Sequence, residues 1–577
     1  MSLTSAFNIA RSGLTAGQIG IQVAGNNIAN ASTPGYSRQV ARLAPIRGDR
    51  TVPNVSIGNG VRVTNIERQV DQALLDRLWA TGAQQIGAGT LSNMYGAVQD
   101  ALGELGDNDL SSELSSFFNA WSERANQTSS SAAVVQSGER LATFVKRLRS
   151  DLVDLRSQSE NELSATVKRA NDLMQRVADL NRDIGQAEIA GHPSNTLRDQ
   201  RDQAVTELSE YFELTAVDRG PQGMDILVGS IPVVLGTQNR GLQVKTREEG
   251  DGVRYALATV ADGSELPVRS GKIGALLTSR DDAINGTIDA IDHLASQLVF
   301  EVNKLHATGR NAAGIRSTTG TMQFATADRD LALTTDNPAL LGQPGKPKTG
   351  SFLIHVRDSG TGTEVATRIN IDLDGLTNAG LPGSDDDTSA EDIRAALDAI
   401  AGVKAEFTAD GKLKVSADDG FEFSFDDDTS DAVATLGLNS FFTGTSGESI
   451  AVRSDLLSDP AKLTAGRMVN GQFVENGNAL RIVQLASNAV EGLKGNSFSG
   501  AWRDEVQRIA GEAASAASTA DSASTVRDAL EAQRQAVSGV SIDEESLNLL
   551  DYQRLYQGSA KIVTVANEMT QTLLNLI

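Results

Sequence analysis

Residues 3–28 read LTSAFNIARSGLTAGQIGIQVAGNNI, and they decide how the chain begins. Steps of four and three residues alternate along this stretch without a break, through Leu3, Phe7, Ala10, Leu14, Gly17, Ile21, Ala24 and Ile28. This spacing places one apolar seam along a helix. We therefore predict an N-terminal helix that buries its seam against another helix.

The C-terminal residues repeat this spacing. From Leu549 the seam passes through Tyr552, Tyr556, Ser559, Val563, Ala566, Thr570, Leu573 and Ile577, and it is widened by Leu555, Ile562, Met569 and Leu576. One terminal helix leads into the chain and the other leads out of it. We expect the two to lie antiparallel and to form a coiled-coil rod.

The N-terminal end is almost uncharged. The chain has 51 basic and 74 acidic residues, a net charge of −23, yet Arg11 is the only charged side chain in residues 1–37. Such an end can pack beside copies of itself without repulsion. Glycines at positions 13, 17, 20 and 25 each lower helix stability by about 1 kcal/mol relative to alanine. We expect this end to be disordered in the free monomer and to become ordered on assembly.

A turn signal follows the N-terminal helix. Pro34 cannot continue a helix and biases Thr33 towards an extended conformation, and Pro34-Gly35 suits the centre of a type II turn. Pro-Gly turns are common, so these residues taken alone indicate an ordinary helix stop.

The residues around this turn also resemble a known family signature. Asn26-Asn27-Ile28-Ala29-Asn30 followed by Thr33-Pro34-Gly35-Tyr36 is similar to the N-terminal signature of bacterial flagellar rod, hook and hook-associated proteins. Residues 538–577 resemble the C-terminal helix of the same proteins. Tyr36-Ser37-Arg38-Gln39 and the helical region after it are most similar to the flagellar hook-associated protein 1 family. The signature residues are Asn26, Asn27, Asn30, Thr33, Pro34, Gly35 and Tyr36.

Periodicity predicts a multidomain fold that is mainly α with inserted β domains. The terminal helices, residues 1–36 and 540–577, form the assembly domain. Residues 37–210, 271–317 and 448–539 form a helical bundle. A small β domain covers residues 211–270, and an outer β-α-β domain covers residues 318–447.

The outer domain has recognisable local signals. Residues 389–400 read as a helix with Ser389 as its cap. Residues 403–407 and 412–416 read as a hairpin with Asp410-Gly411 in the turn. The order resembles the β-α-β module of flagellin and other filament proteins.

No catalytic, cofactor or metal site is predicted. The four histidines, His192, His293, His306 and His355, lack metal-ligand spacing, and there is no cysteine. Asp372-Leu373-Asp374-Gly375 resembles part of a calcium loop but lacks the spaced third ligand and the terminal Glu, which favours a plain turn. An acidic chain without basic, aromatic-rich stretches is a poor nucleic-acid ligand, and no apolar run is long enough for membrane insertion.

The resemblance implies a structural protein rather than an enzyme. It implies an adaptor that assembles with copies of itself as a short layer joining hook to filament, with the hook protein and a second junction protein or the filament as partners. It also implies export through the flagellar type III apparatus to the extracellular flagellum without a cleaved signal peptide, with an export chaperone on the C-terminal helix.

We expect the assembly interface to pair large apolar side chains of the two terminal helices: Leu3, Phe7, Leu14, Ile21 and Ile28 with Leu555, Ile562, Val563, Met569 and Leu573. Two alternatives stay open. One is a hook or rod subunit of the same axial family, and the other is an adhesin or hydrolase that carries its activity in residues 318–447.

Overall fold

The computed structural model describes residues 3–575 apart from residues 48, 49, 53, 54, 57, 104–108, 128, 129, 191, 192, 250, 251, 335, 378, 380, 385, 470 and 471. The chain divides into two compact units. Unit 1 comprises residues 1–94, 159–279 and 513–577, and unit 2 comprises residues 95–158 and 280–512. The four-part domain division stays a prediction.

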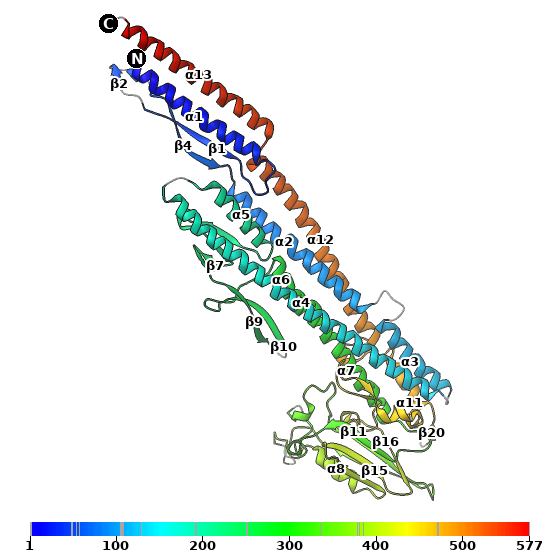
Figure 1. The fold of residues 1–577 in the computed structure, drawn as a ribbon. Helices are drawn as coiled ribbons and strands as arrows, with labels where there is room; N and C mark the ends of the chain where they lie inside the picture. The colour runs from blue at the N-terminus through cyan, green and yellow to red at the C-terminus, as the bar shows by residue number, and fades with distance from the viewer. Residues whose placement is uncertain are drawn as a thin grey trace. The chain divides into compact units, whose positions relative to one another are not determined.

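The two ends of the chain meet in unit 1. Helix α1 (Leu3–Ala29) lies along helix α13 (Ile542–Leu574), as Figure 1 shows. Helix α13 begins after Ser541, whose side chain accepts a hydrogen bond from the backbone N–H of Glu544. Acidic residues in its first turn complement the positive end of the helix dipole.

Glycines bring α1 and α13 into close contact. A Cβ atom on Gly17 would lie 3.1 Å from the backbone N of Tyr556 and 3.2 Å from the backbone O of Tyr552. A Cβ on Gly13 would meet the Ser559 hydroxyl, and one on Gly20 would overlap the Tyr552 ring. Residue numbers rise along α1 as their partners fall along α13, so the helices are antiparallel, as predicted. The disorder expected before assembly stays a prediction.

A hairpin that the sequence analysis missed packs against α1. Strands β1 (Gln39–Pro45) and β4 (Val61–Arg68) pair antiparallel, and the short strands β2 (Arg50–Val52) and β3 (Val55–Ser56) lie between them in the chain. The hairpin is anchored by the backbone N of Val61, which donates to the hydroxyl of Ser12 over 3.1 Å. The sequence analysis places residues 39–68 in the helical bundle. The alternation of apolar and polar residues with period two along β4 could have indicated a strand.

Three long helices contribute residues to both units: α2 (Gln72–Leu102), α4 (Ser131–Ala187) and α12 (Phe498–Ser538). Unit 1 also contains the helices α5 (Asn195–Ser209) and α6 (Gly271–Thr278). Its small sheet has four antiparallel strands in the order β5 (Thr215–Asp218), β6 (Met224–Val228), β7 (Ile231–Leu235) and β8 (Gln238–Asn239). Strands β9 (Leu242–Glu249) and β10 (Gly252–Thr259) form a separate hairpin.

The helical part of unit 2 packs around aromatic side chains. It contains α3 (Leu110–Asn126), α7 (Gly286–Ala307), α10 (Ser454–Ser458) and α11 (Gly477–Leu485), and a π-helical segment (Ser279–Asn285) precedes α7. Trp121 and Phe117 of α3 contact Phe441, with ring centroids 5.7 and 5.8 Å apart. All three side chains are fully buried.

Two three-stranded sheets form the β part of unit 2. One has the order β13 (Glu364–Ile371), β12 (Gly350–Asp358), β16 (Phe421–Asp426), and the other has the order β11 (Ser317–Gln323), β15 (Lys412–Ala417), β14 (Val403–Phe407). Short pairs are formed by β17 (Phe442–Thr443) with β18 (Ala451–Val452) and by β19 (Arg467–Val469) with β20 (Gln472–Val474). A four-residue helix, α9 (Ala432–Thr435), follows β16.

Two local predictions for this region are confirmed. Helix α8 (Ala390–Asp398) is capped by Ser389, which forms a capping box with Asp392. Asp410 and Gly411 lie in the turn between β14 and β15, and Gly411 has a φ of +79°. Strand β16, which pairs with β12, was not predicted.

The helix contact predicts opposite effects for two glycine variants of α1. Gly20→Ala places a methyl group into the Tyr552 ring and should lower the free energy of opening of α1 by about 1–3 kcal/mol. Gly25→Ala is the control, because no atom lies within 4 Å of its Cβ position, and the better helix propensity should leave stability unchanged or raise it by up to about 1 kcal/mol. Amide hydrogen exchange of residues 3–29 measures both. Equal protection in the two variants would refute the close contact.

Candidate assembly interface

Small residues of α1 line its closest approach to α13 within one chain. The buried positions of α1 are Ala10, Gly13, Ala16, Gly17, Gly20, Val23, Ala24 and Asn27, and those of α13 are Glu545, Ser559 and Ala566. Helices whose facing residues are small can approach closely enough for backbone to meet backbone. The large apolar side chains are therefore left beside this contact.

None of the ten predicted interface residues is buried. Leu3, Leu14, Ile21, Ile28 and Val563 are half-buried. Phe7 is 45% exposed, and on α13 the exposed fractions are 37% for Leu555, 43% for Ile562, 55% for Met569 and 49% for Leu573. The chain does not bury this set internally, so its role between copies stays a prediction.

The seven signature residues gather where α1 ends. Helix α1 stops at Ala29, and the amide of Asn30 donates to the backbone O of Asn26 over 2.9 Å. The Thr33 hydroxyl donates to the side-chain O of Asn30 over 3.3 Å. The backbone N of Tyr36 donates to Thr33 O over 3.2 Å, and Gly35 has a φ of +78°. These values confirm the predicted type II turn at Pro34-Gly35.

Asn27 is the centre of a buried hydrogen-bond network. Its side-chain O accepts from the Tyr36 hydroxyl (2.7 Å) and from the backbone N of Gln39 (3.0 Å). Its amide N donates to the backbone O of Gln39 (2.9 Å) and to Oε2 of Glu545 (2.9 Å). Asn27 is fully buried, and these bonds use both ends of its amide. One side chain thus joins α1, the turn, the start of β1 and α13.

Glu545 connects this network to a guanidinium group. Its carboxylate is 3% exposed and accepts from Arg38 Nε over 2.9 Å. Arg38 also lies 3.2 Å from the exposed carboxylate of Glu544, and its backbone N donates to Ser538 O over 2.9 Å. Arg38 therefore links the turn after α1 to the connection between α12 and α13.

The turn is also held against α5. The backbone N of Ser37 donates to Asp199 over 3.3 Å, and Arg68 Nη1 lies 2.8 Å from carboxylate oxygens of both Asp199 and Asp202. Burial raises the pKa of Asp199 in spite of the neighbouring guanidinium. Burial, with the carboxylates of Asp199 and Glu545 nearby, raises the pKa of the Tyr36 phenol to about 12.

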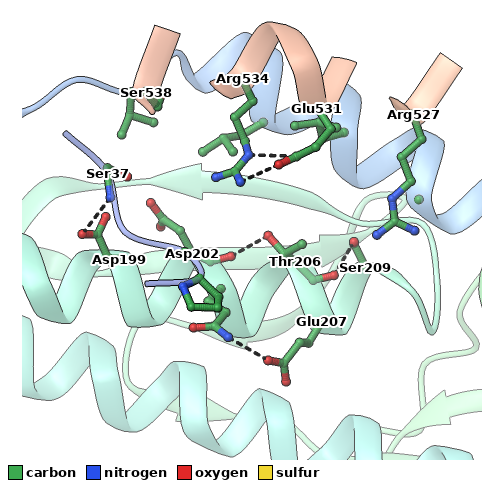
Figure 2. A pocket seen from close by; sticks show the side chains of 17 residues that line it. Ser37, Asp199, Asp202, Thr206, Glu207, Ser209, Arg527, Glu531, Arg534 and Ser538 are labelled. Carbon is green, nitrogen blue, oxygen red and sulfur yellow. Dashed lines mark hydrogen bonds and ion pairs between the residues drawn. The ribbon is translucent and has the colours of Figure 1, made fainter. Parts of the chain in front are cut away.

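A cavity of about 280 Å³ lies beside the turn, between residues of α2, α5 and α12 that belong to unit 1. Figure 2 shows Ser37 next to Asp199, and Arg534 paired with Glu531. Arg527 donates to the side chains of Gln85 (3.0 Å) and Glu210 (3.3 Å). Each charged group around this cavity bonds to a neighbouring side chain.

The sequence analysis missed Glu545, Arg38 and Asp199 as members of the network. Glu545 could have been noticed as an acidic residue in the first turn of a predicted helix. Its burial could not have been predicted, because its partners lie more than 500 residues away along the chain.

The histidines that the structure describes bond to neighbouring protein groups. His306 is fully buried, its ring lies 2.7 Å from Asn439 O, and burial lowers its pKa to about 4. His293 lies 2.7 Å from Gly492 O, and His355 pairs with Glu364 at 2.9 Å. His192 lies outside the described residues. In the described part of unit 1, no group of three acidic or histidine side chains has metal-ligand spacing.

Sequence families match three parts of the chain. Residues 7–36 match the flagella basal body rod protein family, and residues 531–576 match the C-terminal family of the flagellar basal body rod protein FlgEFG. Residues 95–324 match the helical domain of flagellar hook-associated protein FlgK. The two end matches contain most of α1 with its signature turn and all of α13.

Relatives match over the whole length. Flagellar hook-associated protein 1 of Escherichia coli (strain K12) is 26% identical, and that of Salmonella typhimurium is 28% identical, each over 100% of both chains. The Bacillus subtilis (strain 168) protein of the same name is 24% identical over 99% of both chains. The chain is thus similar over its whole length to flagellar hook-associated proteins 1.

The fold is similar to that of a flagellar protein of known structure. The flagellar hook junction protein FlgK from Burkholderia pseudomallei aligns with a TM-score of 0.51 and 13% identity, covering 80% of this chain and 100% of that one. This likeness shows that the two chains have a similar fold.

The Glu545 network predicts different effects for two neighbouring carboxylates. Glu545→Ala leaves Arg38 and the Asn27 amide without their buried acceptor. It should lower the free energy of unfolding of unit 1 by about 2–3 kcal/mol, less than for a fully buried pair because Arg38 keeps Glu544. Glu544→Ala removes a carboxylate that is 63% exposed and should cost about 0–1 kcal/mol. Urea unfolding of both variants gives the comparison, and equal losses would contradict the assigned role of Glu545.

Tyr36 predicts a pH dependence at high pH. The phenol has a pKa near 12 in the fold against an ordinary value of 10, so its contribution to stability is present below pH 10 and is lost as pH rises through 12. Tyr36→Phe should lower stability by about 1 kcal/mol at pH 8, and this deficit should shrink as pH rises above 10. Urea unfolding between pH 8 and 12 measures it.

Tyr211→Phe is the matched control for Tyr36→Phe, because among the described residues no hydrogen bond involves the Tyr211 hydroxyl. It should leave stability unchanged across the same pH range. A deficit of Tyr36→Phe that stays constant up to pH 12 would exclude the raised phenol pKa as its cause.

Proposed function

We propose that this protein is a structural component of the bacterial flagellum that joins the hook to the filament. Support comes from full-length similarity to flagellar hook-associated proteins 1 and from the likeness of its fold to a flagellar hook junction protein. The observation that carries the proposal is the match of residues 95–324 to the hook-associated helical domain. The matches at the two ends are to rod proteins, so they do not distinguish a junction protein from a rod protein.

The rival reading as a hook or rod subunit is weaker for the same reason. The rod-type families cover only residues 7–36 and 531–576, which are the regions that build the helix pair. Shared ends indicate a shared mode of assembly, whereas the helical region between them distinguishes the members. An adhesin or hydrolase activity in residues 318–447 has no observation in its favour.

We propose that copies of the chain assemble through the large apolar side chains beside the α1–α13 contact. Leu555, Ile562 and Met569 recur every seven residues, so they form one stripe along α13, and all three are exposed. Exposed apolar stripes of this kind mark interaction sites. The half-buried Leu14 and Ile21 of α1 offer a second apolar surface. With Arg11 the only charge in residues 1–37, copies can pack their ends together without repulsion.

The remaining partners follow from the family. We propose contacts with the hook protein and with a second junction protein or the filament, export through the flagellar type III apparatus without signal cleavage, and a chaperone on α13 before export. Among the described residues, no helix combines the length and apolarity of a membrane span. An extracellular position in the flagellum agrees with the family.

We also propose that the protein is not an enzyme. Its relatives are named as flagellar hook-associated proteins, and the charged groups around the cavity of unit 1 pair with neighbouring side chains. Its chemistry would then be binding between copies and partners.

The test is a triple variant of the exposed stripe. Leu555→Ser, Ile562→Ser and Met569→Ser together should change monomer stability little, because these side chains are exposed, and should abolish filament attachment and motility in a bacterium lacking the native gene. Each large apolar side chain contributes roughly 1.5–3 kcal/mol when buried between copies. Electron microscopy counts hooks with filaments, and immunoblotting of the medium confirms export.

The control changes three exposed polar residues of the same helix, Gln553→Ser, Lys561→Ser and Glu568→Ser, and should keep filaments. Deleting residues 1–36 or 540–577 should abolish assembly while residues 66–530 stay folded. Normal filaments on cells with the triple variant would refute assembly through this stripe. Normal filaments in the complete absence of the protein would refute the junction function itself.

A further inference from the structure

A long loop in unit 2 returns on itself and brings distant acidic residues together. Asp372 follows the last residue of β13, and Asp387 lies two residues before the cap of α8. The loop is closed by two hydrogen bonds: Thr388 N donates to Asp372 O over 2.7 Å, and Asp372 N donates to the Thr388 hydroxyl over 2.8 Å. The two ends of the loop are thus held side by side.

Three carboxylates meet at this closure. One side-chain oxygen from each of Asp372, Asp374 and Asp387 lies within 4.8 Å of the other two. Among the described residues, none of the three forms an ion pair with a Lys, Arg or His side chain. Three negative charges at this separation repel one another unless a cation lies between them.

Asp387 supplies an independent sign of a ligand. Its residue is only 6% exposed, and its Oδ2 atom is buried without a hydrogen-bond partner. Its other oxygen accepts from the backbone N of Gly375, next to Asp374, over 3.3 Å. The carboxyl group is therefore directed at the Asp374-Gly375 turn, where Gly375 has a φ of +67°. A buried carboxylate oxygen without a partner is costly, and a bound cation removes that cost.

We propose that Asp372, Asp374 and Asp387 bind a hard divalent cation of the calcium type. All three ligands are carboxylates, which suit calcium and magnesium and disfavour zinc or copper. Asp372 and Asp374 are exposed, so water can complete the six to eight oxygen ligands that calcium takes in flexible geometry. The ordered octahedron of magnesium makes a stricter demand on ligand placement.

The cation would act as a cross-link within the β part of unit 2. It ties the turn after β13 to the segment that leads into α8, across a loop that otherwise closes through Thr388 and a few backbone bonds such as Gly383 N to Gly375 O. The site lies in the predicted outer domain, residues 318–447. The inference does not depend on the proposed junction function.

The test is calcium binding to the full chain after treatment with EDTA, measured by titration calorimetry at about 0.15 M salt, which screens diffuse attraction to a chain of net charge −23. One saturable site with a Kd of order 10⁻⁴–10⁻³ M is expected. Asp387→Asn and Asp374→Asn should each weaken binding at least about tenfold. Asp419→Asn, an exposed carboxylate of the same β part with the same change in charge, should bind as the unmodified chain does.

Amide exchange gives the second measurement. Calcium should slow exchange across residues 371–388 in the unmodified chain and in Asp419→Asn, and should have no effect in Asp374→Asn, whose exposed position leaves folding intact. The proposal is overturned by the absence of saturable binding up to about 10 mM calcium, or by unchanged affinity in the Asp387 and Asp374 variants. Magnesium binding as tight as calcium binding would overturn the calcium-type assignment.

Discussion

The buried hydrogen bond between Asn27 and Glu545 joins residues 518 positions apart, and the terminal part of unit 1 depends on it. The side-chain oxygen of Asn27 accepts hydrogen bonds from Tyr36 and from β1. Its amide nitrogen donates to β1 and to Glu545 of α13. Glu545 in turn holds Arg38. Such a network is stable only when every buried member has its partner, so it admits one arrangement of helix end, turn and hairpin.

Beyond this network, α1 and α13 approach each other closely at the glycines of α1. Gly13, Gly17 and Gly20 lower the helix propensity of α1. In return, Gly17 lets the backbone of α13 come close, and Gly13 and Gly20 leave room for the side chains of Ser559 and Tyr552. Helix formation and helix pairing are therefore coupled: α1 gains little stability until its partner is present. On α13, the large apolar side chains of Leu555, Ile562 and Met569 stay exposed.

Unit 2 combines aromatic contacts between distant parts of the chain with local turns. Its helical part is centred on aromatic side chains from α3 and the segment around Phe441, and its sheets are completed by turns with standard residues such as Asp410-Gly411. The loop between β13 and α8 is the exception, since its closure concentrates negative charge around the buried oxygen of Asp387.

By itself, the sequence determined the features that depend on neighbouring residues. The spacing of apolar positions predicted both terminal helices, Pro34-Gly35 predicted the turn, Ser389 predicted a helix cap, and the signature residues pointed to the family. Each of these follows from local backbone preferences or from a motif that is contiguous in the chain.

Tertiary structure alone decided which face of each terminal helix is buried, where the β1–β4 hairpin packs, and that Glu545 and Asp199 lie inside. It also brought Asp387 close to Asp372 and Asp374. Asp387 is the proposed third ligand, and the absence of such a ligand from the sequence motif had favoured a plain turn. The physical reason is the same in every case. Helical spacing shows that a face is apolar, but the distance of approach and the burial of a charge are set by partners far away along the chain.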